Sequence, residues 1–353
     1  MEYRYLGHSG LKVSTLTLGT MTFGGKERFA KLGNIDVKEA REIIHLCIDH
    51  GINLIDTANV YSYGRSEEIV GEALQGKRPG NVLISTKARM VVGDGPNESG
   101  FSKHHLIQQC EKSLKRLRTD VIDIYFMHEW DGATPLEEML EALSHLMQQG
   151  KIRYAGCSNF SGWHIMKALA ISRESNLPRF VTQQIHYTLE AREAEYELLP
   201  IAVDQGVGVM AWSPLSGGLL SGKYTRDKKP EGVTRVSEGW PEPPIRDEER
   251  LWNIVDVVNE IAEARQVPAA RVSLAWVLSR PGVVSLVIGG RKTEHIRDNI
   301  GAASLELSGD ELSRLNKVSE IPLIYPYWHQ AKFAAGTYSD GDLALFGGRS
   351  TDQ

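Results

Sequence analysis

Four ionisable side chains stand at or just after short apolar runs of this 353-residue chain: a carboxylate, a phenol, an ammonium and an imidazole. Asp56, Lys87 and His128 each directly follow such a run, and Tyr61 comes five residues after Asp56. If the runs are strands of one parallel barrel, their C-terminal ends meet on the face where such barrels carry out chemistry. The spacing therefore predicts an acid–base cluster at one end of a barrel.

The four groups together have the roles that the reduction of a carbonyl requires. Such a reduction needs a hydride donor on one side of the carbon and an acid that protonates the oxygen as negative charge develops there. Free tyrosine, with a pKa of about 10, is a poor acid near neutrality, but a neighbouring ammonium stabilises the phenolate and lowers that pKa. We expect Tyr61 to be the acid, Lys87 its ammonium, Asp56 the partner of Lys87, and His128 the group that orients the carbonyl. General acid–base catalysis of this kind contributes about 10²–10⁴-fold.

Each residue also has an ordinary structural interpretation when it is taken alone. Asp56 and Lys87 can form an ion pair at a barrel rim, Tyr61 can be a loop aromatic, and His128 can be a core histidine with satisfied hydrogen bonds. The argument for chemistry depends on their joint placement at the ends of three neighbouring strands.

Two later loops have the composition of phosphate-binding loops, which barrels often place after strands seven and eight. Residues 213–223 are rich in glycine and end in Lys223, and Arg291 and Lys292 precede an expected helix. A cationic pair at a helix start suits a phosphomonoester such as the 2′-phosphate of NADP. The alternative is an ordinary flexible loop and two solvated cations. A P-loop is excluded, because Tyr224 takes the place of the Ser or Thr that would bind Mg²⁺.

Positioning these groups requires alternating strands and helices, and the hydrophobic pattern predicts them. The expected strands are 16–19, 52–55, 82–86, 121–127, 152–156, 180–184, 207–212 and 283–288. The expected helices are 37–50, 66–74, 102–116, 135–149, 161–174, 194–204, 247–265, 268–279, 293–303 and 308–318.

This alternation predicts a (β/α)8 TIM barrel, an α/β fold, in a single domain over 1–353. An N-terminal hairpin caps its floor, and a C-terminal helix plus tail follows it. The tail, 320–353, lies over the active-site cleft, at a subunit contact of a homo-oligomer, or against the outside of the barrel. A doubly wound sheet is the alternative fold, but the first strand lacks the Gly-x-Gly-x-x-Gly spacing that it would need.

Composition narrows the class of protein further. The chain is 41% hydrophobic and 24% charged, with a net charge of −5, which gives no reason to expect nucleic-acid or anionic-membrane partners. Its three cysteines are far apart in sequence and show no metal-ligand spacing, so we expect no metal site and a reducing compartment. No signal peptide or apolar run of about 18 residues is seen, which predicts a cytoplasmic protein.

The chain resembles the aldo-keto reductases over nearly its whole length. The matching motifs are Leu18-Gly19-Thr20-Met21, 53–58 with Tyr61 and Gly64, 85–87, 123–128, 156–160, Gln184 with Tyr187, Trp212-Ser213-Pro214-Leu215 and 289–299. The likeness is greatest to the branch that contains potassium-channel β-subunit-like and bacterial reductases. The resemblance implies an NADP-dependent oxidoreductase that reduces an aldehyde or ketone to an alcohol, with Tyr61 as general acid.

The resemblance also implies residues for cofactor and substrate, with NADH less favoured than NADPH. Cofactor-binding residues would be Gly19, Thr20, Met21, Asp56, Ser158, Asn159, Gln184, Trp212, Ser213, Pro214, Leu215, Gly217, Lys223, Gly289, Arg291, His295, Asp298 and Asn299. Substrate contacts would be Phe23, Tyr61, His128, Trp130 and Trp240. Because the family often has Gln where His295 stands, the strength of the NADP preference stays open.

Two other functions compete with this one. The first is a nucleotide-sensing regulatory or binding subunit with weak reductase activity. The second is a barrel hydrolase in which Asp56 and His128 activate water, which would leave the two phosphate-type loops unexplained.

Overall fold

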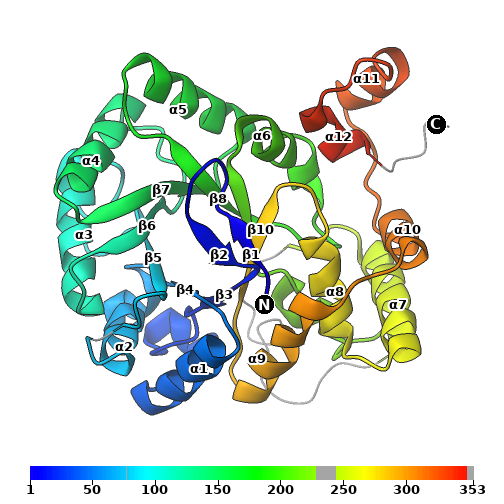
Figure 1. The fold of residues 1–353 in the computed structure, drawn as a ribbon, viewed down its shortest axis with the longest axis horizontal. Helices are drawn as coiled ribbons and strands as arrows, with labels where there is room; N and C mark the ends of the chain where they lie inside the picture. Colours follow the sequence, from blue (N-terminus) through cyan, green and yellow to red (C-terminus); the bar gives the residue numbers. More distant parts are fainter. Residues whose placement is uncertain (77, 228–243, 348–353) are drawn as a thin grey trace.

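Eight parallel strands close on themselves to form the barrel in the computed structural model, which describes residues 1–76, 78–227 and 244–347 (Figure 1). The barrel strands are β3 (Leu16–Gly19), β4 (Leu54–Asp56), β5 (Leu83–Ala88), β6 (Ile122–Met127), β7 (Ile152–Ser158), β8 (Phe180–His186), β9 (Gly208–Trp212) and β10 (Val283–Ile288). They pair in chain order, and β10 closes the ring against β3. The predicted (β/α)8 barrel is confirmed, and the doubly wound sheet is wrong because the sheet has no open edge.

Helices surround this barrel in the expected alternation (Figure 1). The α-helices are α1 (Val37–Asp49), α2 (Arg65–Ala73), α3 (Lys103–Leu117), α4 (Leu136–Gln148), α5 (Gly162–Glu174), α6 (Leu198–Gln205), α7 (Glu248–Arg265), α8 (Ala269–Leu278), α9 (Thr293–Ile300), α10 (Gly309–Val318), α11 (Tyr327–Phe333) and α12 (Asp340–Phe346). Short 3-10 turns are η1 (Glu27–Lys31), η2 (Tyr61–Gly64), η3 (Glu193–Glu195), η4 (Ser216–Ser221) and η5 (Gly301–Ser304).

Several boundaries differ from the prediction for identifiable reasons. The helix expected at 194–204 is instead η3 followed by α6, because Pro200 lacks an N–H and fits only in the first turn of a helix. Strand β4 includes Asp56, and β5 includes Lys87. The hydrophobic pattern stops at these two charged residues. The strands continue through them because Asp56 and Lys87 bind each other at the barrel mouth.

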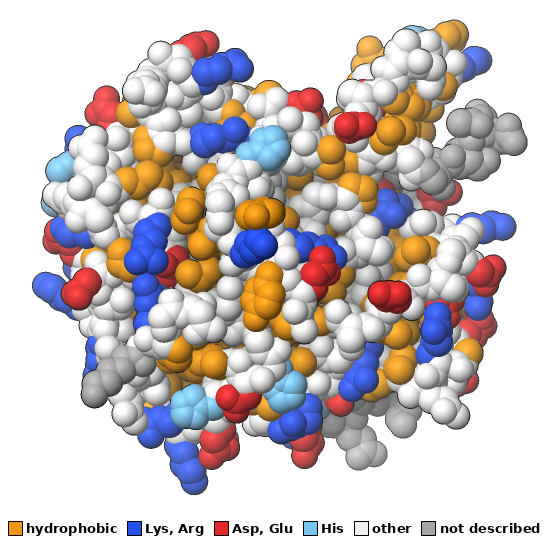
Figure 2. Space-filling model, in the orientation of Figure 1, with side chains coloured by type: hydrophobic (Ala, Val, Ile, Leu, Met, Phe, Trp, Pro, Cys, Tyr) orange, Lys and Arg blue, Asp and Glu red, His pale blue; other side chains and the backbone are white. Residues whose placement is uncertain are grey.

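The N-terminal hairpin closes the end of the barrel where the strands begin. Strands β1 (Tyr3–Tyr5) and β2 (Lys12–Ser14) pair antiparallel, and Leu6 and Val13 join the inner core with side chains from β4, β5, β6, β8, β9 and β10. A Cβ on Gly7, which has φ +57°, would lie 2.3 Å from the Val181 carbonyl, so only glycine allows this close packing. Figure 2 shows this face as a continuous surface with Lys, Arg, Asp and Glu side chains interspersed.

The C-terminal segment lies beside α6, outside the ring of strands (Figure 1). Helix α12 packs on α6, and the Tyr196 and Tyr327 rings stack with centroids 5.3 Å apart. The sequence pattern did not predict α11 or α12. Among the described residues, no helix combines the length and apolar character that a membrane crossing requires.

Candidate active site

A buried ion pair occupies the mouth of the barrel at the C-terminal ends of β4 and β5. The Lys87 Nζ donates to Asp56 Oδ2 at 2.5 Å and to the Thr57 carbonyl at 2.8 Å. The other Asp56 oxygen accepts from Ser85 Oγ at 2.7 Å and from Gln184 Nε2 at 3.1 Å. Lys87 and Asp56 are 0% and 1% exposed. Their partners therefore hold both charges in fixed positions before any ligand binds.

The ammonium form of Lys87 is favoured in this setting. Burial alone would lower the pKa of Lys87, but the charges of Asp56 and of the Tyr61 side chain outweigh it and raise the pKa above its ordinary value. Lys87 therefore keeps its positive charge throughout the physiological pH range.

The predicted acid, Tyr61, lies directly beside this pair. The Lys87 Nζ is 3.4 Å from the Tyr61 hydroxyl, and the Tyr61 ring meets the His128 ring edge-on at 5.7 Å. Tyr61 begins η2, a turn in which Ser62 and Tyr63 have positive φ. The Ser62 hydroxyl secures the turn, because it donates to the Phe23 carbonyl and accepts from the Gly25 N–H.

His128 completes the predicted cluster. Its backbone N–H donates to the Ala88 carbonyl at 3.0 Å, and its carbonyl accepts from Asn159 Nδ2 at 3.1 Å. Burial of the imidazole and the positive charges of Lys87 and Arg89 hold the pKa of His128 well below its usual value. The ring is therefore neutral near pH 7. Its Nδ1 is buried with no hydrogen-bond partner in the part of the chain that the structure describes.

Four residues predicted to bind the cofactor, Ser158, Asn159, Gln184 and Trp212, come together at the ends of β7, β8 and β9. Trp212 Nε1 donates to Asn159 Oδ1 at 3.0 Å, and Ser158 Oγ donates to the Gln184 carbonyl at 2.8 Å. The Trp212 ring stacks on His186 with centroids 4.6 Å apart, a contact that the sequence did not suggest. The Gln184 amide bonds Asp56, so it links this group to the acid–base cluster.

The glycine-rich loop after β9 forms a tight backbone cradle. Ser213, Ser216, Gly217 and Gly218 all have positive φ. The Gly217 N–H donates to Ser213 Oγ at 3.2 Å, and a Cβ on Gly218 would meet nothing within 4 Å. The backbone of this segment is therefore open to an approaching group, which is the property that a pyrophosphate requires.

Cationic side chains gather where this loop meets the one after β10. The Lys223 Nζ lies 3.3 Å from His295 Nε2. Burial and the charges of Lys292 and Arg291 lower the pKa of Lys223, and burial and the charges of Lys223 and Lys292 lower the pKa of His295. Arg291 donates to the carbonyls of Lys31 and Leu32. Like charges in one place favour an anion between them.

Other predicted residues have mainly structural surroundings. Phe23 is 1% exposed within the hydrophobic core, and the Thr20 hydroxyl contacts Ser66 and the Asp56 carbonyl. Gly19 packs its backbone closely against β10, where a Cβ would lie 2.7 Å from Val287. Pro214 and Asn299 are buried, Met21 and Leu215 are half-buried, and Gly289 and Asp298 are exposed.

Two predicted substrate residues remain. Trp130 stacks on His164 with ring centroids 3.6 Å apart and meets the Phe160 ring edge-on. Trp163, next to His164 at the start of α5, is 60% exposed. These rings form an aromatic group in the segments after β6 and β7. Trp240 lies outside the described residues.

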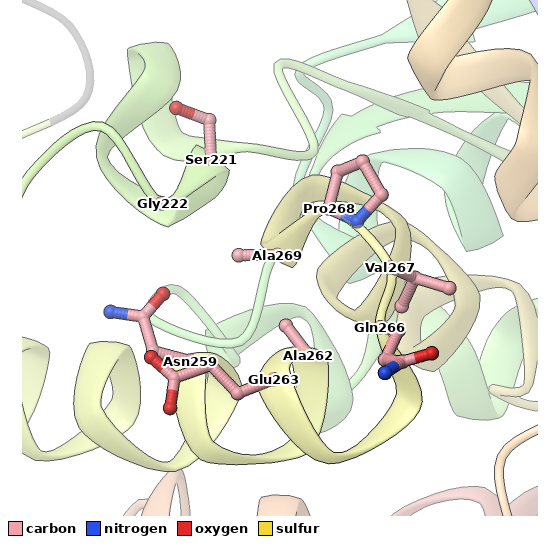
Figure 3. Close-up of a pocket in the computed structure, with 9 residues that line it drawn as sticks. All are labelled: Ser221, Gly222, Asn259, Ala262, Glu263, Gln266, Val267, Pro268 and Ala269. Carbon is pink, nitrogen blue, oxygen red and sulfur yellow. The ribbon is translucent and has the colours of Figure 1, made fainter.

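A surface cavity of about 390 Å³ lies beside the glycine-rich loop rather than at the acid–base cluster (Figure 3). Ser221 and Gly222 line one side, and α7 and the start of α8 supply Asn259, Glu263 and Ala269. None of the four catalytic candidates lines it, so we do not assign the reaction to this cavity.

The barrel and its mouth define a class of protein: a parallel barrel with a buried Asp–Lys pair, a tyrosine and a histidine clustered on the face where its strands end. The family model "Aldo/keto reductase family" matches residues 15–320. The chain is 40% identical over 330 residues to "Uncharacterized oxidoreductase YrpG" of Bacillus subtilis (strain 168), covering 90% of this chain and 96% of that protein.

Two plant proteins are also similar to the chain. A "Probable voltage-gated potassium channel subunit beta" of Arabidopsis thaliana is 36% identical over 310 residues, 86% of this chain and 92% of that protein. One of the same name from Oryza sativa subsp. japonica is 35% identical over 307 residues, 86% and 91% of the two chains. The chain belongs to the aldo/keto reductase family, as the sequence motifs predicted, and is an oxidoreductase of that family.

Proposed function

We propose that this protein is an NADPH-dependent reductase that converts an aldehyde or ketone to an alcohol, with Tyr61 as the general acid. The observation that carries the proposal is the 3.4 Å contact between the Lys87 ammonium and the Tyr61 hydroxyl, with Asp56 holding Lys87 from the other side. An ammonium at this distance stabilises the phenolate that remains after Tyr61 gives up its proton. We also propose that the protein is cytoplasmic and that the whole chain forms a single domain.

A nicotinamide dinucleotide suits the donor set around the mouth. Ser158, Asn159 and Gln184 offer the hydrogen-bonding groups that a carboxamide needs, and Trp212 offers a flat ring. The open space at Gly218 and the positive φ angles of Gly217 and Gly218 suit a pyrophosphate. When bound, the reduced nicotinamide supplies the hydride.

The 2′-phosphate would lie among the cations after β9 and β10. Lys223 and His295 are held 3.3 Å apart, with Lys292 and Arg291 close enough to affect the pKa of Lys223. A phosphomonoester dianion would offset the repulsion between Lys223 and the positive charges of Lys292 and Arg291. NADH carries a neutral 2′-hydroxyl at this position and would not. The preference for NADPH over NADH rests on this difference.

Each side chain of the cluster has a separate role in the proton transfer. Tyr61 donates its proton to the carbonyl oxygen, and Lys87 stabilises the phenolate. Asp56 keeps the ammonium in place through its contacts with Ser85 and Gln184. His128, neutral near pH 7, donates a hydrogen bond that orients the carbonyl without adding a second positive charge.

The test is nucleotide oxidation by the purified protein against a panel of neutral aldehydes and ketones. We expect NADPH oxidation with at least one carbonyl, about one equivalent of alcohol for each NADPH, and a kcat/KM at least about tenfold lower with NADH. Tight NADPH binding without oxidation across the panel would favour the nucleotide-sensing subunit instead. That alternative is worth testing because two relatives are named as channel subunits.

A further inference from the structure

Arg89 is a cation close enough to the reaction mouth that its charge, after burial and the charge of Lys87, lowers the pKa of His128. None of the roles described above gives it a contact with a ligand. It directly follows β5, two residues after Lys87. The His128 N–H donates to the carbonyl of Ala88, the residue before Arg89. Arg89 therefore lies in the segment next to the residue that orients the carbonyl.

The backbone of Arg89 is strained for a residue with a side chain. Its φ is +133°, a region that only glycine adopts easily, and the Gly100 N–H anchors it by donating to the Arg89 carbonyl at 2.8 Å. Strain of this kind costs about 1–3 kcal/mol and is concentrated at functional sites. A bulky cation in a position that favours glycine suggests that the guanidinium itself has a use.

No acidic side chain of the described residues forms a direct ion pair with the Arg89 guanidinium. Burial alone would raise the pKa of Asp131, but hydrogen bonds from Thr134, Ala133 and Phe101, together with the charge of Arg89, lower that pKa. Among the described residues, Arg89 forms no ion pair within 4.0 Å and no side-chain hydrogen bond, and its Nε is buried without a partner. The neighbouring acid, Asp131, already accepts from the Phe101 and Ala133 N–H groups and from the Thr134 hydroxyl. A half-buried arginine without a direct contact to a carboxylate is able to bind an anion from solution.

Arg89 lies across the barrel from the loops that are proposed to bind the nucleotide phosphates. In the closed ring, β5 is opposite β9 and β6 is opposite β10. The cluster of Lys223, Arg291 and His295 follows β9 and β10. An anion at Arg89 therefore approaches from the substrate side.

We propose that Arg89 binds the carboxylate of the substrate and that the preferred substrates are carbonyl compounds carrying a carboxylate. This inference rests on the proposed reductase function and names its substrate class. The planar guanidinium offers paired N–H donors that match a carboxylate. The aldehyde takes one hydride from NADPH and one proton from Tyr61 to give a primary alcohol and NADP⁺, and the carboxylate is unchanged.

The experiment compares 4-formylbenzoate with its methyl ester, which has the same ring and aldehyde but no charge. For the wild type we expect kcat/KM at least about tenfold higher for the acid, the size of one charge-assisted contact. Arg89→Gln should remove this preference, mainly by raising KM for the acid, so that kcat/KM falls much more for the acid than for the ester. Arg89→Lys, which keeps the charge without the paired geometry, should fall between them.

Two outcomes overturn the proposal: a wild type that does not distinguish the acid from the ester, or an Arg89→Gln variant that loses both activities equally. The second result would mean that Arg89 only positions His128 and its segment. If Arg89→Gln is insoluble, wild-type kinetics from roughly 0.02 M to 0.5 M NaCl replace it, since only the acid's advantage should fall as salt screens the charge.

Failure of the reductase function gives a different result from failure of this inference. If neither aldehyde is reduced, calorimetric titration with 4-formylbenzoate still tests the carboxylate site. Binding that Arg89→Lys weakens several-fold supports the site, and binding that is absent or unchanged by the substitution rejects it. Reduction of the ester with no charge dependence rejects the inference and leaves the reductase proposal standing.

Discussion

The two sides of the barrel mouth differ in their electrostatics: one holds a pair of opposite charges, and the other holds several positive charges. At the ends of β4 and β5, Asp56 and Lys87 are buried, oppositely charged and bonded on every side. After β9 and β10, Lys223 Nζ lies 3.3 Å from His295 Nε2, and burial together with positive neighbours lowers the pKa of each. The first region is complete without a ligand, whereas the second gains stability when an anion arrives.

This contrast suggests which functions each region serves. A proton donor must be held in fixed geometry before the reaction, because reorganisation during the chemical step slows it. A nucleotide site must instead release its product, so part of its favourable energy appears only on binding. Substitution of Asp56 or Lys87 should therefore affect both folding and turnover, and substitution of Lys223 or His295 should affect mainly ligand binding.

The largest expected effect comes from Asp56→Asn. This change leaves the Lys87 ammonium buried without its carboxylate, a situation that costs about 3–5 kcal/mol. We expect the free energy of unfolding, measured by urea denaturation, to fall by that amount and turnover to fall with it. The control is Asp120→Asn, since Asp120 is exposed. Equal stability of the two variants would mean that the pair is not a structural unit.

The next effect is a pH dependence at His186, which ends β8 and stacks on Trp212. Burial lowers the pKa of His186 to about 4. In the unfolded chain, the imidazole has a pKa of about 6.5 and therefore binds a proton more readily than in the folded protein. The free energy of unfolding is therefore highest above pH 6.5 and falls as the pH decreases towards 4. From pH 7.5 to pH 5, His186 should account for about 2 kcal/mol of lost unfolding free energy.

His186→Phe is the matched variant, because phenylalanine keeps a ring against Trp212 but does not titrate. Its unfolding free energy should change less between pH 7.5 and pH 5 than that of the wild type. An identical pH dependence in both proteins would show that His186 is not buried as a neutral ring.

The smallest expected effect concerns Lys223→Ala. Loss of one cation from this exposed cluster should weaken NADPH binding on the order of tenfold and change NADH binding little. The melting temperature of the free protein should not fall, because a repulsive neighbour has been removed. Fluorescence titration with both nucleotides measures the difference, and Lys115→Ala, on the exposed side of α3, is the control. Equal weakening for both nucleotides would contradict a 2′-phosphate role.

The barrel was predictable because each strand is a short apolar run and each helix has clear end signals. Asp56, Tyr61, Lys87 and His128 were predictable as a cluster because the topology brings the ends of β4, β5 and β6 together. The contacts that complete the cluster were not. Ser85 and Gln184 bond Asp56 from different strands, and only the closure of the barrel fixes those distances.

Arg89 shows a different limit of the sequence. A cation two residues beyond Lys87 was visible. Its proposed role depends on a positive φ and on a buried Nε that has no hydrogen-bond partner among the described residues, and neither feature has a sequence pattern. Phe23 shows the converse. It is expected at the substrate, and its side chain is buried in the hydrophobic core, which the sequence did not indicate; its contact with a substrate stays a prediction. Helices α11 and α12 escaped prediction because each is only about two turns long.

The most direct test of the account is Tyr61→Phe, which removes one oxygen and keeps the ring against His128. We predict that the carbonyl-dependent oxidation of NADPH falls by about 10²–10⁴-fold, while NADPH affinity and the free energy of unfolding stay close to wild type. A Tyr61→Phe variant that turns over at the wild-type rate would contradict the assignment of Tyr61 as the acid.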